Sequence, residues 1–297
     1  MKKFLTIMVA LLLCMTFMFG MVGCSKPENS GRVKLIDIRL TNEDYGIAIN
    51  KDDATLLSTV NQVLANKQTE IENVYKLYNE TGVEEGYYVE GVVAYADGMN
   101  SEQYLVLATD YPFEPYEYMV GTNYAGIDIE IGKMIADELG KTLAIKYVAF
   151  DLICTTVNNG GADLGLAGLT ITDGRKNTVN FSNPYETGTY QVIIVPEEVT
   201  LFDDCETKED VIEVLSSYAN GTKAGSQTGT TGAKYIQGDL DDAEGFQFTG
   251  YANLTLKTYT THADAVRDMV NGQVSLCVVD YSVAVSIVNQ INSAVNK

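Results

Sequence analysis

The sequence is poor in histidine, cysteine and positive charge, and each shortage excludes a class of function. Its 297 residues include one histidine and five scattered cysteines, so a zinc site built from His and Cys ligands is not expected. A single histidine leaves no Ser–His–Asp arrangement, and no cysteine stands in a recognisable Cys–His motif. We therefore predict no metal, no cofactor and no enzymatic activity.

Positive charge is outnumbered two to one. The chain carries 20 Lys and Arg residues against 40 Asp and Glu residues, for a formal net charge of −20. Such a surface repels nucleic acid and anionic lipid, so no nucleic-acid partner is expected. With 46% hydrophobic and 20% charged residues, the composition is that of a globular chain with one or two cores.

The first residues resemble a secretory signal. Lys2 and Lys3 precede an apolar stretch over residues 4–22, which is the pattern of a signal peptide over residues 1–23. The alternative is a transmembrane helix. The apolar stretch is near the lower limit for spanning a bilayer, however, and polar sequence follows it at once.

The end of this stretch resembles a bacterial lipobox. The sequence Met-Val-Gly-Cys ends at Cys24, although its first two positions are atypical. In such signals the cysteine becomes the lipidated N-terminus of the mature protein. We therefore expect Cys24 to anchor the protein to the outer face of the cell membrane, with residues 24–32 as a tether. Three cysteines then remain, which allow at most one disulfide: Cys154, Cys205 and Cys277.

Strand and helix patterns alternate from residue 104 onward. Alternation at these lengths indicates parallel βαβ units in an α/β protein. Ligands bind such sheets at the carboxyl ends of the strands, where Asp110, Gly168 and Arg175 fall. The predicted strands cover residues 104–109, 143–148 and 164–169, and the predicted helices cover residues 127–139 and 150–158.

A further strand is predicted at residues 191–195, and a second alternating set follows a break at Pro196. Residues 207–210 have the spacing of a capping box that opens a helix. A turn rich in glycine and threonine over residues 225–232 leads into another helix, whose N-terminus favours an anion. The turn lacks the Gly-Lys-Ser/Thr ending of a nucleotide P-loop. A strand predicted at 274–279 ends at Asp280, and the two sets imply two lobes with a cleft between them.

The most informative run is Ala167–Arg175, with sequence AGLTITDGR. A strand that stops at Gly168 frees backbone groups, two threonine hydroxyls stand beside them, and Arg175 follows. Because a planar guanidinium holds a carboxylate through two parallel hydrogen bonds, the run predicts a cradle for a small carboxylate. The alternative is a strand end, a turn and a surface arginine.

Seven fragments together resemble the polar amino-acid family of type 2 periplasmic substrate-binding proteins, the ligand-capturing components of ABC importers. The fragments keep the family's order and approximate spacing over residues 104–297. The resemblance implies an α/β fold of two mixed sheets with flanking helices, joined by a hinge with two crossovers. The fragments are ATDYPFEPY at 108–116, GIDIE at 126–130, VAFD at 148–151, AGLTITDGR at 167–175, FSNPY at 181–185, GSQTGTTG at 225–232 and VVDY at 278–281.

The family's usual final segment resembles the front of this chain. Residues 45–51 resemble the strand with which the family returns to its first lobe, and residues 56–78 resemble its last two helices. The chain stops where a family member would continue into a strand such as residues 33–40. We therefore hypothesise a circular permutation, with the old termini joined through about residues 80–103. An unrelated N-terminal extension is the alternative.

The permutation implies a particular division into lobes. The first lobe is expected to be contiguous over residues 45–192. The second is expected to combine residues 33–43 with residues 197–297. The two hinge crossings then fall near residues 40–46 and 192–198.

The resemblance assigns the two charges of a free amino acid to opposite partners. It implies that Arg175 binds the carboxylate, helped by Thr170, Thr230 and neighbouring backbone N–H groups. It implies that Asp280 binds the ammonium, helped by the carbonyl of Gly168. Asp280 also suits the position of a helix N-cap, and both roles can hold together.

The resemblance also implies walls for the ligand side chain. Phe113 and Phe150 match positions whose rings flank that side chain, with core packing as the alternative. Asp110 matches a position that meets a polar or cationic tip, with a strand-end cap as the alternative. Tyr116 is a weaker wall candidate. His262 opens a helix and is expected to be a solvated residue near its cap.

These observations predict a monomeric, extracytoplasmic lipoprotein that binds a free amino acid, with a polar or cationic one favoured. It would deliver this ligand to the permease of an ABC importer. One alternative is a dehydratase-like enzyme on the same scaffold, with Asp110 or Glu114 as general acid and base. Another is a sensor lipoprotein with the same pocket and no permease.

Overall fold

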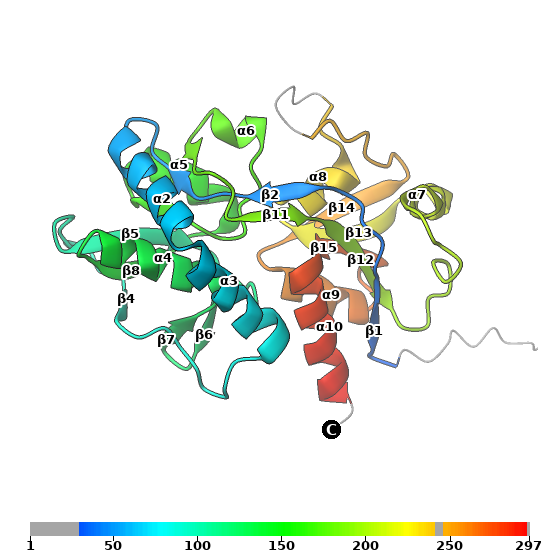
Figure 1. Cartoon of the computed structure of the whole chain (residues 1–297). Helices are drawn as coiled ribbons and strands as arrows, with labels where there is room; N and C mark the ends of the chain where they lie inside the picture. Colours follow the sequence, from blue (N-terminus) through cyan, green and yellow to red (C-terminus); the bar gives the residue numbers. More distant parts are fainter. Residues whose placement is uncertain (1–29, 241–245, 296–297) are drawn as a thin grey trace, which may run out of the picture. The chain divides into compact units, whose positions relative to one another are not determined.

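The computed structural model describes residues 30–240 and 246–295 of the chain (Figure 1). The predicted signal peptide, the lipidation site Cys24 and residues 24–29 of the predicted tether lie outside these residues. Within the described ranges, no helix is both long enough and apolar enough to cross a membrane. Two mixed sheets with flanking helices organise the chain, so the predicted α/β architecture is confirmed.

The first lobe is built around a six-stranded sheet. The strands β9, β5, β8 and β4 run parallel. β3 pairs antiparallel with β9, and β10 pairs antiparallel with β3 at the edge of the sheet. In spatial order the strands are β10 (Asn180–Phe181), β3 (Ala48–Ile49), β9 (Leu164–Gly165), β5 (Tyr104–Thr109), β8 (Thr142–Tyr147) and β4 (Val92–Ala94). The helical segments of this part of the chain are α2 (Ala54–Asn66), α3 (Gln68–Lys76), η1 (Leu77–Thr81), α4 (Ile127–Glu138), η2 (Phe150–Leu152), α5 (Ile153–Asn158) and α6 (Asp173–Lys176), and a hairpin joins β6 (Tyr118–Val120) to β7 (Asn123–Ala125).

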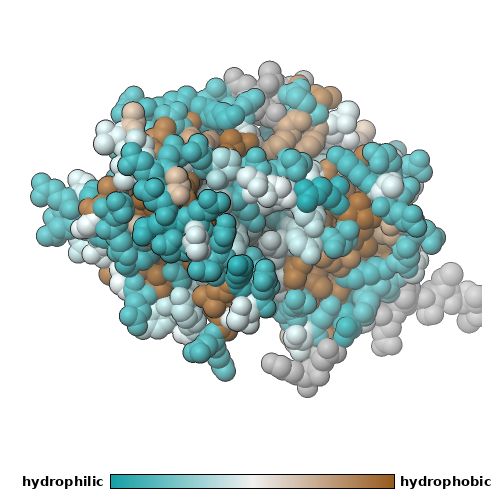
Figure 2. All heavy atoms as spheres, in the orientation of Figure 1, coloured by the Kyte–Doolittle hydropathy of each residue, from teal (hydrophilic) through white to brown (hydrophobic). Residues whose placement is uncertain are grey.

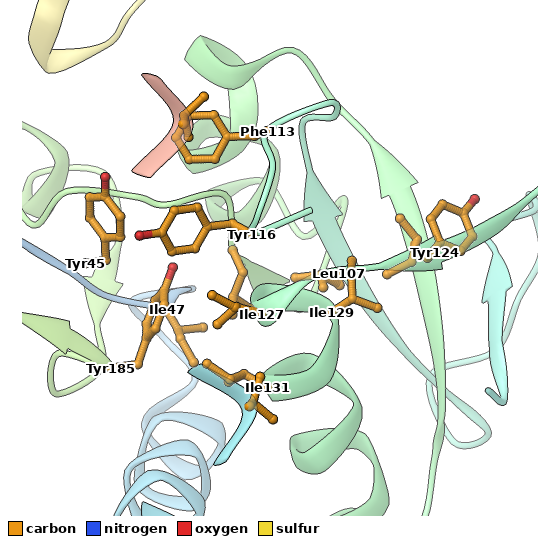
Figure 3. Packing of buried hydrophobic residues seen from close by; sticks show 14 of the residues in the cluster. Tyr45, Ile47, Leu107, Phe113, Tyr116, Tyr124, Ile127, Ile129, Ile131 and Tyr185 are labelled. Atoms are coloured by element: carbon orange, nitrogen blue, oxygen red, sulfur yellow. The ribbon is translucent and has the colours of Figure 1, made fainter. Parts of the chain in front are cut away.

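Helix α4 fills the space between this sheet and helices α2 and α3. Ile127, Ile131 and Ile135 follow the helical period, and all three are fully buried, as is Ile129 on a neighbouring face. Burying each such side chain contributes roughly 1.5–3 kcal/mol relative to leaving it in water. Figure 3 shows three of these isoleucines beside a group of aromatic rings that includes Phe113 and Tyr116.

The second lobe is built around a five-stranded sheet. β13, β14 and β15 run parallel, and β12 is antiparallel to both of its neighbours. In spatial order the strands are β1 (Val33–Ile36), β12 (Gln191–Pro196), β15 (Leu276–Asp280), β13 (Thr222–Gln227) and β14 (Leu254–Tyr259), and the helices are α7 (Lys208–Ser217), α8 (Thr231–Gln237), α9 (His262–Val270) and α10 (Tyr281–Val295). The predicted capping box is confirmed: the Thr207 hydroxyl accepts from the N–H of Asp210, whose carboxylate accepts from the N–H of Thr207.

The chain passes between the sheets through β2 (Glu43–Tyr45) and β11 (Glu186–Thr189), which pair with each other antiparallel. The expected first crossing at 40–46 contains β2. The expected second crossing at 192–198 is wrong, because most of those residues lie in β12 and pair with β1 and β15. The apolar run of β12 is buried in the second sheet, so the crossing comes earlier, in the more polar β11.

The two described ends of the chain lie next to each other. β1 is the edge strand beside β12, and the side chain of Asn292 in α10 binds both backbone groups of Val33. Its Oδ1 accepts from the Val33 N–H at 3.0 Å, and its Nδ2 donates to the Val33 carbonyl at 2.8 Å. In Figure 1, β1 accordingly runs beside α10 and the marked C-terminus.

The segment from α2 to β4 belongs to the first lobe. Val60 and Val63 of α2 and Ile71 and Val74 of α3 are buried in the same apolar cluster as α4. Between α3 and β5, the chain adds β4 as a parallel edge strand beside β8. The face seen in Figure 2 is mostly hydrophilic, with the apolar residues gathered in separate patches.

Candidate functional site

The run Ala167–Arg175 starts just after β9 and turns sharply at Gly168. This glycine has φ +53°, and its N–H donates to Oδ2 of Asp128 at 3.0 Å. A Cβ added here would lie 2.6 Å from Cε1 of Phe113. Both the left-handed backbone and the close ring therefore require glycine at this position.

Arg175 lies in the short helix α6 and joins loops from both lobes. Thr172 caps this helix, since its hydroxyl accepts from the Arg175 N–H at 3.1 Å. The guanidinium donates from Nη1 to the Thr170 carbonyl at 2.7 Å and from Nη2 to the Gly229 carbonyl at 3.2 Å. Its Cζ lies 5.0 Å from the ring centre of Phe150.

A cavity of about 250 Å³ opens beside this guanidinium. Three of the predicted ligand residues line it, namely Phe150, Arg175 and Thr230. The hydroxyl of Thr230 is engaged as the cap of α8, because it accepts from the Ala233 N–H and lies 2.8 Å from the Gln227 carbonyl. The other five predicted residues do not line the cavity and lie in buried contacts deeper between the lobes: Asp110, Phe113, Gly168, Thr170 and Asp280.

Asp280 ends β15 and is buried between elements of both lobes. Its Oδ1 accepts from Tyr45 Oη at 2.6 Å and from Gln191 Nε2 at 2.7 Å, while its Oδ2 lies 3.7 Å from His262 Nε2. Burial raises the pKa of this carboxyl, and the hydrogen bonds from Tyr45 and Gln191 oppose that rise. Asp280 is therefore a buried carboxyl whose charge is partly compensated by hydrogen bonds.

The prediction for His262 is wrong. The ring is 1% exposed and lies 5.7 Å from the ring of Phe113, centre to centre. Burial lowers its pKa to about 3, which leaves it neutral at physiological pH. The sequence did carry a signal: His262 begins the helical stripe of Ala265, Val266 and Met269, all of which are buried. Burial of His262 therefore follows from its position on the apolar face of α9, not from its position near the helix cap.

Asp110 follows β5 and is also buried. Its carboxylate accepts a hydrogen bond from the side-chain amide of Gln227 in β13, so this contact joins the two lobes. Burial raises the pKa of Asp110 to about 6, against the opposing effect of hydrogen bonds from Gln227, Tyr147 and the backbone of Phe150.

Phe113 packs in the core, which is the alternative that the sequence offered to a wall for the ligand side chain. It is buried, and its ring lies 5.5 Å from that of Tyr116, which in turn lies 5.5 Å from that of Tyr45. Figure 3 shows these three rings side by side. Phe113 also contacts the position of Gly168, so it packs into the core while shaping the loop that precedes Thr170.

Sequence reasoning missed Glu43 in β2. This carboxylate is 2% exposed and accepts from Thr41 Oγ1 at 2.6 Å and from Thr170 Oγ1 at 2.7 Å. Burial, and then the charge of Asp280, raise its pKa to about 7. The only signal in the sequence was an acidic residue two positions after a threonine, in a segment that was read solely as a hinge.

Two further buried carboxyls lie near the loop, and one of them, Asp128, binds it directly. Asp128 in α4 accepts from the N–H of Gly168 and, at 3.1 Å, from the hydroxyl of Tyr185. Burial raises the pKa of Asp128 to about 6, and it raises that of neighbouring Glu117 well above its usual range. Neither residue was predicted, because an isolated acidic residue in an amphipathic pattern is usually a solvated one.

The interior between the lobes is thus rich in carboxyls and poor in cations. Among the described residues, no lysine or arginine is buried, whereas five carboxyls are buried here: Glu43, Asp110, Glu117, Asp128 and Asp280. Burial removes these groups from water, which raises their pKa values, and Arg175 opposes the rise at Asp280.

Curated relatives match parts of this chain. The arginine-binding extracellular protein ArtP of Bacillus subtilis is 32% identical over 89 residues, which are 30% of this chain and 35% of that protein. A probable histidine-binding protein of Neisseria gonorrhoeae is 31% identical over 125 residues, 41% of this chain and 46% of that protein. The chain thus spans between a third and a half of the length of these relatives.

Solved structures match a larger part. An ancestral arginine-binding protein bound to arginine is 29% identical with a TM-score of 0.53, covering 64% of this chain and 76% of that one. The ancestral amino acid-binding protein AncCDT-1, a precursor of cyclohexadienyl dehydratase, is 26% identical with a TM-score of 0.53, covering 64% and 75%. These neighbours have the two-lobed fold of type II periplasmic binding proteins. The family model for bacterial extracellular solute-binding proteins, family 3, matches residues 105–283, more than half of the sequence, and the chain belongs to that family.

Proposed function

We propose that the protein captures a free amino acid between its two lobes and delivers it to the permease of an ABC importer. In this proposal it acts as a monomer on the outer face of the bacterial membrane, anchored through a lipid on Cys24. The arginine- and histidine-binding proteins among its relatives support a cationic or polar ligand.

The observation that carries this proposal is the position of Arg175 at the meeting point of the lobes. Its guanidinium already accommodates two oxygen acceptors, one from the Thr170–Arg175 loop and one from the loop before α8. A carboxylate offers the same pair of oxygens on a single group. The proposed partners of the ligand carboxylate are therefore Arg175, Thr170 and the backbone N–H groups around Thr230.

The proposed partners of the ligand ammonium are Asp280 and the carbonyl of Gly168. Since Arg175 and Asp280 belong to different lobes, one zwitterion that binds both favours the closed arrangement. The remaining carboxyls supply the preference for a side chain of positive charge. Asp110 is the proposed partner of that side chain, with Phe113 and Phe150 as its walls.

Calorimetric titration of the mature protein with free amino acids tests the proposal. We expect saturable binding of at least one basic or polar amino acid, and we expect Arg175→Ala to abolish most of it. Lys176→Ala is the matched control, because Lys176 lies on the same short helix in an exposed pair with Asp173. Equal affinity of Arg175→Ala and the unchanged protein would refute the assigned site.

We also propose that the chain is a circular permutant of its family. The proximity of Val33 to Asn292 supports it, as does the pairing of β1 with β12. The packing of α2 and α3 on α4 agrees with their resemblance to the family's last two helices. The match of the family model begins only at residue 105, after the displaced segment. The lobe boundaries proposed from the sequence then need one revision, with the crossings at β2 and β11.

A rearranged chain tests the permutation. It would begin at residue 104, run to residue 297, and continue through a short Gly/Ser linker into residues 33–80. We expect this chain to fold and to bind the same ligand as the original order. If residues 33–103 were an unrelated extension, a chain of residues 104–297 alone would fold and bind equally well, which would refute the permutation.

One observation favours a dehydratase-like enzyme as a second candidate. AncCDT-1, a precursor of a dehydratase, has the same fold, and Asp110 has a pKa raised to about 6, which suits a general acid. Incubating the protein with small carboxylic acids and analysing for dehydrated products separates this candidate from a binding protein.

A further inference from the structure

Glu43 lies where the two lobes meet and contacts the proposed carboxylate site through one hydroxyl. Its Oε2 is 2.7 Å from Thr170 Oγ1, and its Oε1 is 2.6 Å from Thr41 Oγ1. On its other side, Thr170 Oγ1 lies 3.3 Å from the hydroxyl of Thr231 in α8. Glu43, Thr170 and Thr231 thus form a chain of side chains that leads from the hinge strand into both lobes.

The hydroxyl of Thr170 has a single proton to donate. When Glu43 is ionised, it can only accept, so the Thr170 proton points to Glu43. The hydroxyl then presents only lone pairs to its surroundings. A ligand carboxylate also presents only lone pairs, so the two groups repel each other in that state.

We propose that Glu43 binds a proton when the amino acid enters, and so turns the Thr170 hydroxyl toward the ligand carboxylate. Protonated Glu43 donates to Thr170 Oγ1, and Thr170 then donates its own proton to the ligand. The proton comes from solvent, and no other bond is made or broken. The inference rests on the proposed function, because it takes the ligand carboxylate to lie at Thr170. Glu43 is a positioning residue in this scheme.

The surroundings of Glu43 make this proton available near neutral pH. Burial and the charge of Asp280 in β15 raise the pKa of Glu43 to about 7, while hydrogen bonds from threonines oppose the rise. The guanidinium of Arg175 in α6 and the hydroxyl of Tyr45 in β2 also interact electrostatically with the Glu43 carboxyl. Burial raises the pKa of Glu186 in the paired strand β11 to about 7 as well.

His262 in α9 is the remaining titratable group beside Asp280, and burial lowers its pKa to about 3. It therefore stays neutral throughout the pH range in which Glu43 titrates. Proton uptake near neutral pH therefore cannot be assigned to His262.

Two charges of the ligand act on this proton in opposite directions. The ammonium proposed at Asp280 would cancel that negative charge and favour ionised Glu43. The carboxylate would favour protonated Glu43, and it is separated from Glu43 by only one hydroxyl. The hydrogen bonds decide whether Glu43 gains or loses a proton on binding, because only protonated Glu43 lets Thr170 donate to the ligand carboxylate. A lost hydrogen bond to a charged group is the costlier defect.

Proton-linked calorimetry on the unmodified protein tests the relay. Titrations at about pH 7.5 in phosphate and in Tris, whose ionisation enthalpies differ, give the number of protons bound per ligand. We expect uptake that approaches one proton. Kd should rise above about pH 7 by up to about tenfold per pH unit, the limit for one linked proton. Zero uptake, or proton release, would overturn the inference.

Glu43→Gln isolates the group responsible. The amide of glutamine donates to Thr170 permanently, so this variant should retain binding while losing both the proton uptake and the rise of Kd with pH. Glu186→Gln is the matched control, because Glu186 has a similarly raised pKa but contacts the hydroxyl of Tyr75. It should keep the uptake. Uptake that persists in Glu43→Gln would assign the proton to another group and refute the relay.

Two further results keep the inference separate from the proposed function. If Glu43→Gln fails to fold, as judged by circular dichroism, Thr170→Ala is measured instead. It removes the hydroxyl while retaining Glu43, so its residual binding should lack proton uptake, and full uptake would overturn the relay. If the unmodified protein binds no amino acid, the proposed function fails. If it binds one and depends on Arg175 without proton uptake, only the relay fails.

Discussion

Replacing Gly168 by alanine is expected to destabilise the protein by about 2–4 kcal/mol. Two independent effects add at this position. The backbone has φ +53°, a left-handed conformation that costs an L-residue with a Cβ on the order of 1 kcal/mol. The new Cβ would also lie 2.6 Å from Cε1 of Phe113 and 3.3 Å from Cε2 of Tyr45.

The steric part cannot be relieved by moving one flexible side chain. Phe113 is buried against Tyr116 and His262, so its ring has no open space to enter. Overpacking of this kind costs typically 1–3 kcal/mol. The N–H of Gly168 that donates to Asp128 would also be displaced if the loop moved instead.

Gly140→Ala provides the control for the backbone effect. Gly140 has φ +66°, and a Cβ added there would meet no atom within 4 Å. Urea denaturation of both variants, followed by circular dichroism, should show a loss of about 1 kcal/mol for Gly140→Ala and a clearly larger loss for Gly168→Ala. Equal losses would refute the argument that the ring of Phe113 limits this loop.

Three other predictions address the site, a helix and the buried carboxyls. Arg175→Ala should weaken amino acid binding by on the order of 2–5 kcal/mol in calorimetry, because it leaves a buried carboxylate unpaired. Thr207→Ala removes the capping box of α7 and should lower the free energy of unfolding by about 1 kcal/mol, measured by denaturation. The pKa of Asp128 is raised from 3.8 to about 6. The stability that protonated Asp128 contributes to the folded protein is therefore complete below about pH 4 and is lost as the pH rises through about 6. Thermal unfolding midpoints should therefore fall less between pH 4 and 7 for Asp128→Asn than for the unchanged protein, and an identical fall would contradict the shift.

The sequence predicted the sheets well where apolar runs are long and poorly where pairing is short. β5 and β12 are buried strands with continuous apolar sequence, and both were expected almost at their observed bounds. β9 was expected to extend to Leu169, but only Leu164 and Gly165 pair, because Gly168 turns the chain away. β4 was not expected, since two of its residues are exposed on the sheet edge and give no alternating pattern.

The hinge and the buried charges were harder to predict for a related reason. β11 has the sequence ETGT, which carries no apolar signal, and it forms only because β2 lies beside it. Glu43, Glu117 and Asp128 are charged residues whose burial depends on partners far away in sequence, such as Thr170 and Tyr185. A local pattern can show which residues have ligand chemistry, but only the tertiary fold shows which polar residues share an interior.

The contacts between the lobes bear directly on ligand affinity. The Asp110 carboxylate accepts from Gln227, Arg175 donates to the Gly229 carbonyl, and Thr170 lies beside the Thr231 hydroxyl. Each contact uses a group that is proposed to bind the amino acid, so the ligand must replace these partners with its own charges. A neutral amide or carbonyl is a weaker partner for a charged group than an opposite charge is. The exchange is therefore most favourable for a ligand with a carboxylate for Arg175 and a cation for Asp110, which is the combination that a basic amino acid supplies.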